Sequence, residues 1–163
     1  MITEFRGDYR FLSNFYPAAV YLDGVQYPTV EHAFQAAKST RRQYREKILM
    51  TESPGKAKRE GRSLPVSDMI PQWERIRLEV MADLLMQKFF HPDLRAQLLA
   101  TGEEELIEGN TWGDTFWGVC RGEGLNKLGQ LLMVVRQMYR VIEGNPIYEK
   151  SLIERVGPPV LPV

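Results

Sequence analysis

The sequence predicts a mainly helical α+β fold with a small β-hairpin near its N-terminus. Apolar residues recur at the i, i+3, i+4, i+7 spacing of amphipathic helices in several segments. The strongest hairpin signal is Asp23-Gly24, which lies between two short β-prone runs within residues 18–27. The chain has 163 residues, of which 44% are hydrophobic, enough for a sizeable core. We therefore expect one domain over residues 1–143, followed by an irregular, proline-rich extension over residues 144–163.

Composition excludes several classes of protein. The 21 basic and 21 acidic residues balance, whereas dedicated duplex nucleic-acid binders usually have strongly basic surfaces. One cysteine, Cys120, rules out an internal disulfide, and only two histidines leave no zinc ligand set at the usual spacing. The sequence shows no apolar run long enough to span a bilayer and no secretory signal. We expect a cytoplasmic protein that needs neither a metal nor a cofactor.

The charge is unevenly distributed along the chain. Residues 1–62 contain 11 basic residues against 7 acids, so the remainder carries the opposite balance. This asymmetry suits a small anionic ligand held by the N-terminal half. Solvated helix faces alone could produce it equally well.

Residues 5–16 read as a loop after a short strand, and the first helix follows the hairpin. Thr29 is its expected N-cap, and Glu31 lies in its first turn, where the helix dipole favours an acid. Glu31, Gln35 and Lys38 share one polar stripe beside the apolar face. Such a stripe is often only a solvated face, but small neighbouring alanines leave room for a cleft.

The third expected helix, after one over residues 43–50, begins at Ser53-Pro54, a favourable N-cap and first-turn pair. It carries a basic cluster that can bind phosphate, although basic surface helices are common. The members of this cluster are Lys56, Lys58, Arg59 and Arg62.

The longest expected helix covers residues 71–90 and has an apolar stripe that begins at Trp73. Arg77 interrupts this stripe, so we expect it to snorkel, meet an anion or stack on a ring. A further helix after His91-Pro92 should end at Gly102, and the last helix should run from an Asn126 cap to Gly144.

Residues 112–118, WGDTFWG, have the composition of a binding loop. Two tryptophans supply planar surface, and the glycines allow close backbone approach. Trp-Gly pairs also build tight corners in cores. Asp114 favours a cleft, because an acid between two indoles is costly to bury without a partner.

Four blocks in this order and spacing resemble the YbiA-like family, also called the NADAR domain (NAD and ADP-ribose related). They are residues 11–17 (FLSNFYP), 27–38 (YPTVEHAFQAAK), 56–62 (KAKREGR) and 112–118 with Gly124, Asn126 and Gly129. The resemblance extends over roughly residues 5–139. It implies a compact, single-domain YbiA-like helical fold whose members hydrolyse N-glycosidic bonds.

The resemblance also implies a substrate class. Family members act on ribosylaminopyrimidine phosphates of the early riboflavin pathway, and others remove ADP-ribose from guanine bases. We therefore expect a small phosphorylated N-riboside or an ADP-ribosylated base as ligand. A non-catalytic nucleotide-binding or ADP-ribose-binding module is the main alternative, and a pure protein-interaction domain explains the tryptophan loop least well.

The candidate site residues fall into three groups according to their expected roles. The catalytic candidates are Glu31, Lys38 and Asp114. The substrate-binding candidates are Asn14, Phe15, Trp73, Arg77, Trp112, Trp117, Gly118 and Asn126. The phosphate-binding candidates are Lys56, Lys58, Arg59 and Arg62.

These residue types suit the chemistry, because cleavage of a base from ribose passes through an oxocarbenium-like state that a carboxylate stabilises. Lys38 has two open roles. It can fix Glu31 as a charge partner, or it can act as an amine nucleophile that captures the opened sugar as a Schiff base.

Overall fold

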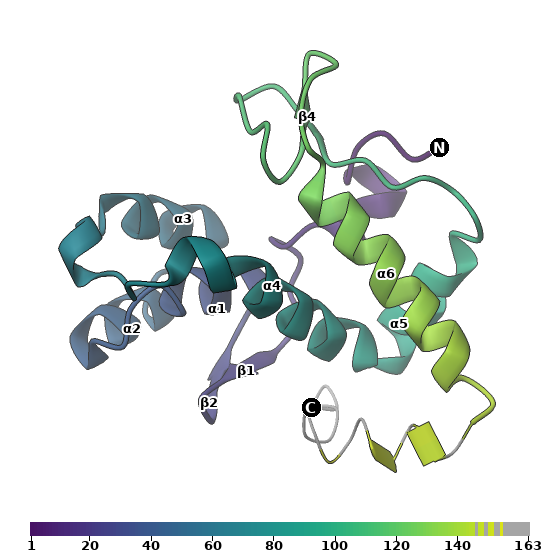
Figure 1. Cartoon of the computed structure of the whole chain (residues 1–163), viewed down its shortest axis with the longest axis horizontal. Helices are drawn as coiled ribbons and strands as arrows, with labels where there is room; N and C mark the ends of the chain where they lie inside the picture. Colours follow the sequence, from purple (N-terminus) through teal and green to yellow (C-terminus); the bar gives the residue numbers. More distant parts are fainter. Residues whose placement is uncertain (146, 149, 152–153, 155–163) are drawn as a thin grey trace. The chain divides into compact units, whose positions relative to one another are not determined.

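The computed structural model describes residues 1–145, 147–148, 150–151 and 154, and it confirms the mainly helical class with a small hairpin (Figure 1). The predicted extension over residues 144–163 is described only in part, and its proline-rich end, residues 157–163, lies outside the described residues. In order, the elements are η1 (Gly7–Leu12), β1 (Val20–Leu22), β2 (Val25–Tyr27), α1 (Val30–Ala36), α2 (Arg42–Leu49), α3 (Pro54–Ser63), η2 (Val66–Asp68), α4 (Trp73–Phe90), α5 (Pro92–Ala100), β3 (Gly109–Asn110), β4 (Val119–Cys120) and α6 (Lys127–Ile142).

The chain groups into two compact units. The central unit contains Asn14–Lys88, and the terminal unit contains Met1–Ser13 together with Phe89–Val163. No helix within the described residues is both long and apolar enough to cross a membrane.

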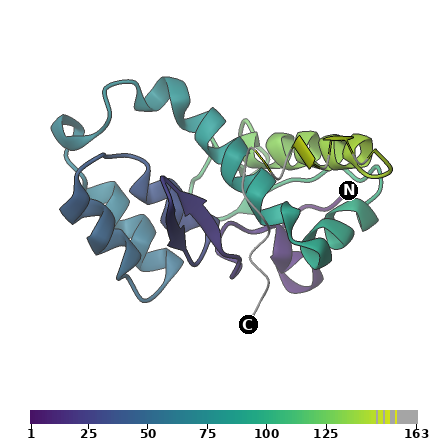
Figure 2. The same ribbon diagram turned by 90° about the horizontal axis from the view of Figure 1, so that it is seen from below.

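The hairpin forms where the sequence predicts it. β1 and β2 pair antiparallel, with Leu22 opposite Val25 at the closed end. Asp23 and Gly24 both have positive φ, 49° and 78°, as a type I′ turn requires. The hairpin lies against α1, as Figure 2 shows.

The predicted cap of α1 is confirmed, because the Thr29 side chain accepts a hydrogen bond from the His32 amide. All seven residues of α1 are buried, since α2, α3 and the hairpin pack against it (Figure 1). α1 is therefore the buried centre of the central unit, and its polar side chains lie inside the packing rather than on a solvated face.

Close contact between α1 and α3 depends on a glycine. A Cβ atom added at Gly61 would lie 1.8 Å from Oε1 of Gln35, well inside van der Waals contact. Ala57, one turn earlier on the same helix, is also fully buried. Small residues on α3 thus let the two backbones approach.

α1 is shorter than the polar stripe suggests. It ends at Ala36, and Lys38 lies in a tight turn in which its amide donates to the carbonyl of Gln35 at 3.3 Å. The Lys38 carbonyl in turn accepts from the Ile70 amide at 2.8 Å, far along the chain. This distant contact explains why the helix stops before Lys38.

α4 matches its predicted apolar stripe in most positions. Ile76 and Val80 are only half-buried, whereas the remaining stripe residues are fully buried. These buried residues are Trp73, Met81, Leu84, Leu85 and Phe89.

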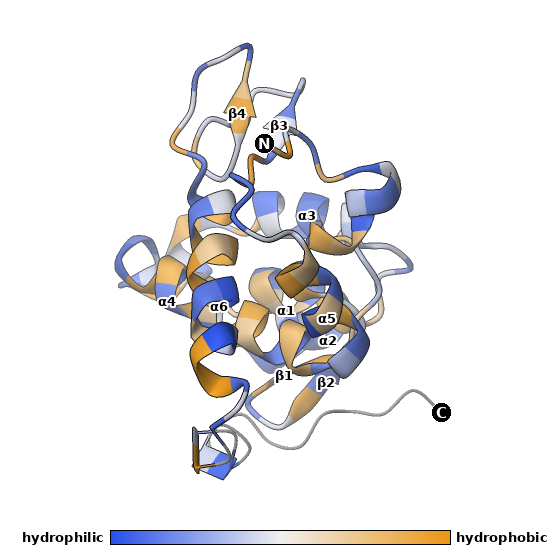
Figure 3. Ribbon diagram, turned by 90° about the vertical axis from the view of Figure 1, so that its right-hand side faces the viewer, coloured by the Kyte–Doolittle hydropathy of each residue, from blue (hydrophilic) through white to orange (hydrophobic). Residues whose placement is uncertain are grey.

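In the terminal unit, α5 packs against α6, and the two-residue strands β3 and β4 pair in parallel (Figure 3). Gly102 follows α5 with a φ of 58°, the predicted C-terminal glycine. One local prediction is wrong: residues 7–12 form the 3₁₀ helix η1 instead of a loop after a strand. Phe11 and Leu12 are buried, and the 3₁₀ turn directs both apolar side chains inward.

Candidate functional site

Glu31 is the buried acid of the central unit, with only 6% of its surface exposed. One helical turn later, the Gln35 side-chain amide donates to Oε1 of Glu31 at 2.7 Å. The Glu31 amide donates to the Asn14 carbonyl at 3.1 Å. Side chain and backbone of Glu31 are therefore both fixed by neighbours, so its carboxylate has a defined orientation.

Asn14 and Phe15 enter this part of the central unit from the segment before the hairpin. The Asn14 side-chain amide donates to the Met81 sulfur at 3.5 Å. Within the described residues, Oδ1 of Asn14 is buried and has no hydrogen-bond partner. Phe15 is 39% exposed, and the Lys58 ammonium lies 5.9 Å from the centre of its ring.

Lys38 extends from the turn after α1 toward α3. Its Nζ donates to the Gly61 carbonyl at 3.4 Å. Burial lowers the pKa of Lys38, and the nearby Arg62 and Lys58 lower it further. The fraction of neutral amine is therefore larger than for an exposed lysine.

Two acids oppose this lowering of the Lys38 pKa. Glu31 is the stronger of them, and Glu74 at the start of α4 is the weaker. Burial remains the largest contribution, so the net direction is downward. The structure thus brings the predicted catalytic pair Glu31 and Lys38 within electrostatic range of each other.

The predicted basic cluster on α3 divides into two parts. Lys58 and Arg62 are four residues apart on α3, and both lower the pKa of Lys38. They therefore lie on the face of α3 that is turned toward Lys38. Lys56 forms an ion pair with Glu52, and Arg59 is exposed. Lys58 and Arg62 are thus the members that are placed with Glu31 and Lys38.

The first turn of α4 adds a buried aromatic ring to the core of the central unit. Trp73 packs on Phe34 of α1, with ring centres 5.0 Å apart and planes inclined by 53°. Arg77 forms an ion pair with Glu74 at 2.9 Å, which is the anion contact expected for an arginine on this face.

In the terminal unit, Asp114 organises the tryptophan loop. Its Oδ1 accepts hydrogen bonds from the amides of Phe116 at 3.2 Å and Trp117 at 2.9 Å. The Asn110 side chain donates to the Asp114 carbonyl at 2.7 Å and accepts from the Asp114 amide at 3.0 Å. Asp114 therefore shapes the loop backbone, a role that the catalytic interpretation did not include.

Gly118 is required by the backbone that passes beside it. A Cβ atom at this position would lie 2.2 Å from the Glu108 carbonyl oxygen. Its own φ needs no glycine, so the requirement is one of space. A side chain here would push β4 away from the preceding segment.

Asn126 precedes α6 as predicted, but its side chain does not cap the helix. It has a φ of 50°, and its side chain donates to the Leu106 carbonyl at 2.9 Å and accepts from the Glu108 amide at 3.0 Å. Asn126 therefore joins the start of α6 to the segment before β3.

The tryptophan loop itself satisfies the free amides at the start of α6. The carbonyls of Phe116 and Trp117 accept from the amides of Lys127 at 3.1 Å and Leu128 at 3.0 Å. The amides in the first turn of a helix have no carbonyl partner within the helix itself. The loop and the helix therefore share one hydrogen-bonding scheme.

The two tryptophans of the loop differ in exposure. Trp112 is 52% exposed, whereas Trp117 is half-buried and packs edge-on against Phe116, with ring centres 5.0 Å apart. Trp112 thus offers the open planar surface of this loop.

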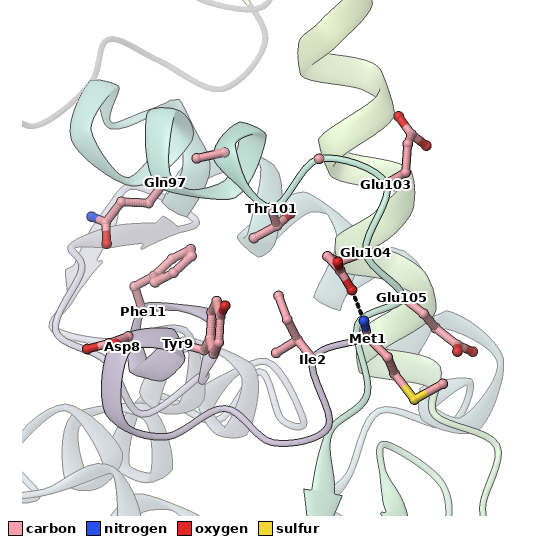
Figure 4. A pocket seen from close by; sticks show the side chains of 12 residues that line it. Met1, Ile2, Asp8, Tyr9, Phe11, Gln97, Thr101, Glu103, Glu104 and Glu105 are labelled. Carbon is pink, nitrogen blue, oxygen red and sulfur yellow. Dashed lines mark ion pairs between the residues drawn. The ribbon is translucent and has the colours of Figure 1, made fainter.

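A separate pocket of about 780 Å³ in the terminal unit contains none of the predicted site residues (Figure 4). Ile2, Tyr9 and Phe11 project into it, and the N-terminal ammonium forms an ion pair with Glu104 at one side. The pocket has no signature in the sequence, because its lining comes from three short segments that share no motif.

The predicted site residues therefore form two groups. The central unit holds Asn14, Phe15, Glu31, Lys38, Lys56, Lys58, Arg59, Arg62, Trp73 and Arg77, and the terminal unit holds Trp112, Asp114, Trp117, Gly118 and Asn126. Two further residues of the central unit contact the first group but are absent from the candidate site residues: Gln35, which the sequence places on the polar stripe with Glu31, and Gly61. Their signals were present: Gln35 is one turn from Glu31, and Gly61 interrupts a helix at a cost in propensity.

Comparison with known proteins identifies the family. The NADAR domain model matches residues 3–140. N-glycosidase YbiA of Escherichia coli (strain K12) is 40% identical over 136 residues, which cover 82% of this chain and 84% of that protein. A riboflavin biosynthesis protein of Vibrio vulnificus (strain YJ016) is 40% identical over 134 residues, covering 78% of this chain and 35% of that protein.

The fold agrees with these sequence matches. The NMR structure of the E. coli protein YbiA has a TM-score of 0.77 to this structure at 38% sequence identity, covering 89% of this chain and 88% of that one. This likeness confirms the predicted YbiA-like fold. The chain therefore belongs to the NADAR domain family.

Proposed function

We propose that this protein hydrolyses the N-glycosidic bond of a phosphorylated N-riboside, with ribosylaminopyrimidine phosphates as its substrates. The protein is a hydrolase of N-glycosyl bonds, as its relatives named N-glycosidase indicate. The Vibrio relative named for riboflavin biosynthesis supports the choice of substrate.

The observation that carries the proposal is the pairing of Glu31 with Lys38. Glu31 is a buried carboxylate held by a 2.7 Å hydrogen bond, and Lys38 is a half-buried amine of lowered pKa within electrostatic range of it. Burying two ionisable groups costs free energy, which a purely structural helix would avoid. Groups of this kind cluster at functional sites.

In a direct hydrolysis, Glu31 stabilises the positive charge that develops on the ribose. The bond from the anomeric carbon to the base nitrogen breaks, and its electron pair goes to that nitrogen. Water adds to the anomeric carbon with loss of a proton, and the departing nitrogen takes up a proton. Lys38 then serves as the charge partner of Glu31.

In the alternative route, the neutral Lys38 amine attacks the anomeric carbon and the base leaves with the bonding electron pair. Ring opening then gives an imine between Lys38 and the sugar, and water hydrolyses the imine to release both. The lowered pKa of Lys38 favours this route, because only the neutral amine is a nucleophile.

The remaining residues of the central unit suit the rest of such a substrate. Lys58 and Arg62 supply positive charge for the phosphate, and the exposed ring of Phe15 supplies aromatic surface for the base. Trp73 is buried and supports this region from within the core. Asp114 shapes its loop in this proposal and takes no proton.

The test is to incubate the purified protein with a ribosylaminopyrimidine phosphate and, separately, with ADP-ribosylated guanine. We expect free base and ribose phosphate from the first compound. Release from ADP-ribosylated guanine alone would assign the second substrate class. Binding of either compound without turnover would contradict the proposal and leave a nucleotide-binding module.

A further inference from the structure

Gln35 is buried on α1 with 4% of its surface exposed, and its side chain contacts two parts of the central unit. Its Nε2 donates to Oε1 of Glu31 at 2.7 Å. Its Oε1 is buried as well and, within the part of the chain that the structure describes, has no hydrogen-bond partner. A leucine or methionine would fill the same space without leaving a buried oxygen unpaired.

The orientation of this amide follows from its neighbours. A carboxylate only accepts hydrogen bonds, so the amide must turn its NH₂ group toward Glu31. Oε1 then faces Gly61 on α3, where an added Cβ would lie 1.8 Å from it. Gly61 therefore provides the space that lets Gln35 direct its donor at the carboxylate.

The same glycine contacts Lys38, because its carbonyl accepts the hydrogen bond from Lys38 Nζ. Gln35 and Lys38 are thus both placed by one residue of α3. The Gln35 backbone is fixed too, since its carbonyl accepts a hydrogen bond of 2.8 Å from the Tyr44 hydroxyl on α2.

We infer that Gln35 is a positioning residue for Glu31, which holds the carboxylate ionised and aimed by donating to it and is itself held by Gly61. This inference rests on the proposed function for its effect on turnover. Its effect on the ionisation of Glu31 does not depend on any substrate, because a lost donor destabilises the charged carboxylate in the free protein as well.

The ionisable groups around Glu31 come from several elements. Lys38 lies in the turn after α1, Lys58 and Arg62 act on Lys38 from α3, and Glu74 does so from α4. Tyr44 on α2 donates to the Gln35 carbonyl, and His32 directly follows Glu31 on α1. None of these groups changes when Gln35 is replaced, so a shift in titration reports the loss of the Gln35 donor.

The first test is Gln35→Met, which keeps length and apolar packing but removes the donor. We expect kcat to fall about tenfold or more with little change in KM, the scale of losing support for a positioned charged group. In the substrate-free protein, the titration midpoint of the Glu31 carboxyl carbon, followed by NMR, should rise above its wild-type value.

The second test is Gln35→Glu, which has the same shape and replaces the donor with a like charge. Two carboxylates at this distance share a proton, so the acidic limb of the kcat profile should move to higher pH. If Gln35→Met fails to fold, this isosteric variant carries the test alone.

Ile48→Val is the matched control, because Ile48 is fully buried on the neighbouring helix α2 and lies outside the proposed site. It should lower stability without altering kcat or the Glu31 titration. A Gln35→Met protein with wild-type kcat and an unmoved Glu31 midpoint would overturn the inference. An inactive wild-type protein with a shifted Glu31 midpoint in Gln35→Met would instead overturn the proposed function alone.

Discussion

The Nζ of Lys38 donates to the Gly61 carbonyl at 3.4 Å, so the amine of this half-buried lysine rests against the backbone of α3. A carbonyl is a weaker partner for an ammonium than a carboxylate is. The contact therefore places Lys38 without compensating fully for its burial, and the lowered pKa of Lys38 is the result.

Replacement of Lys38 by arginine separates the two mechanisms. If Lys38 is the nucleophile, Lys38→Arg should be inactive, because a guanidinium keeps the charge but cannot form an imine. Borohydride added during turnover should also trap the sugar on the wild-type protein as a covalent mass increase at Lys38. Mass spectrometry of the digested protein locates the adduct.

The competing outcome is equally clear. If Lys38 only pairs with Glu31, the arginine variant should retain substantial activity and borohydride should trap nothing.

The lowered pKa of Lys38 favours the nucleophile, so we expect the rate of the wild-type reaction to rise with pH as Lys38 loses its proton. The midpoint of this rise should lie below 10.5, the ordinary value for a lysine.

The two predicted acids should respond differently to neutral substitutions. Glu31→Gln should lower kcat by about 10² or more, the loss typical of a positioned charged group. Asp114→Asn keeps an oxygen that can accept from the Phe116 and Trp117 amides, so it should retain most of the activity. Steady-state kinetics on both purified variants measures the difference.

A large loss of kcat in Asp114→Asn, with the fold intact by circular dichroism, would restore the catalytic role for Asp114. Wild-type turnover in Glu31→Gln at saturating substrate would reduce Glu31 to a buried structural acid.

Lys58 and Arg62 should govern the binding of a phosphorylated substrate. Replacement of either by alanine should raise KM severalfold and weaken the dependence of KM on salt. The value of kcat should fall less than KM rises, and only because the missing cation no longer lowers the pKa of Lys38. Arg42→Ala is the control, since Arg42 lies on α2 and pairs only locally with Glu46 in an exposed contact. Equal KM changes in all three variants would indicate a general charge effect and move the phosphate site elsewhere.

His32 should make the fold sensitive to mild acid. Burial lowers its pKa from the ordinary 6.5, although the hydrogen bond to the Thr51 carbonyl opposes the shift. The unfolded chain therefore binds a proton first, and stability that is fully present above pH 6.5 should fall as the pH drops toward the folded pKa. The slope should reach at most about 1.4 kcal/mol per pH unit.

Urea unfolding between pH 5 and pH 8 measures this slope, and His32→Gln should remove its His32 contribution. If that variant does not fold, NMR titration of the His32 ring in the wild-type protein gives the same answer. A ring that titrates above 6.5 would contradict the prediction.

Local rules explain which parts of this fold the sequence predicts well. The hairpin turn at Asp23-Gly24 and the caps at Thr29 and Ser53 depend on a few neighbouring residues, and all three form as expected. The helix stop at Gly102 is local in the same sense. Such features are decided by backbone conformation and by one side-chain hydrogen bond each.

The misplaced features depend on residues far along the chain. Lys38 lies outside the helix, and its carbonyl accepts a hydrogen bond from the amide of Ile70. The Asn126 side chain does not cap α6, because it is hydrogen-bonded to the backbone of Leu106 and Glu108. No local pattern contains these partners. The contact of Gln35 with Gly61 is of the same kind, although the helix-interrupting glycine was visible in the sequence.

The hydrogen bonds between the tryptophan loop and α6 bear on how this protein can change over evolution. The loop backbone is hydrogen-bonded to the Asp114 carboxylate and to the first amides of the helix, and none of these hydrogen bonds involves the indole of Trp112. Exchanging that side chain leaves the frame intact, but altering Asp114 or Gly118 disturbs both loop and helix. New ligand preferences can therefore arise at position 112 by single substitutions, while the residues that set the frame stay under constraint.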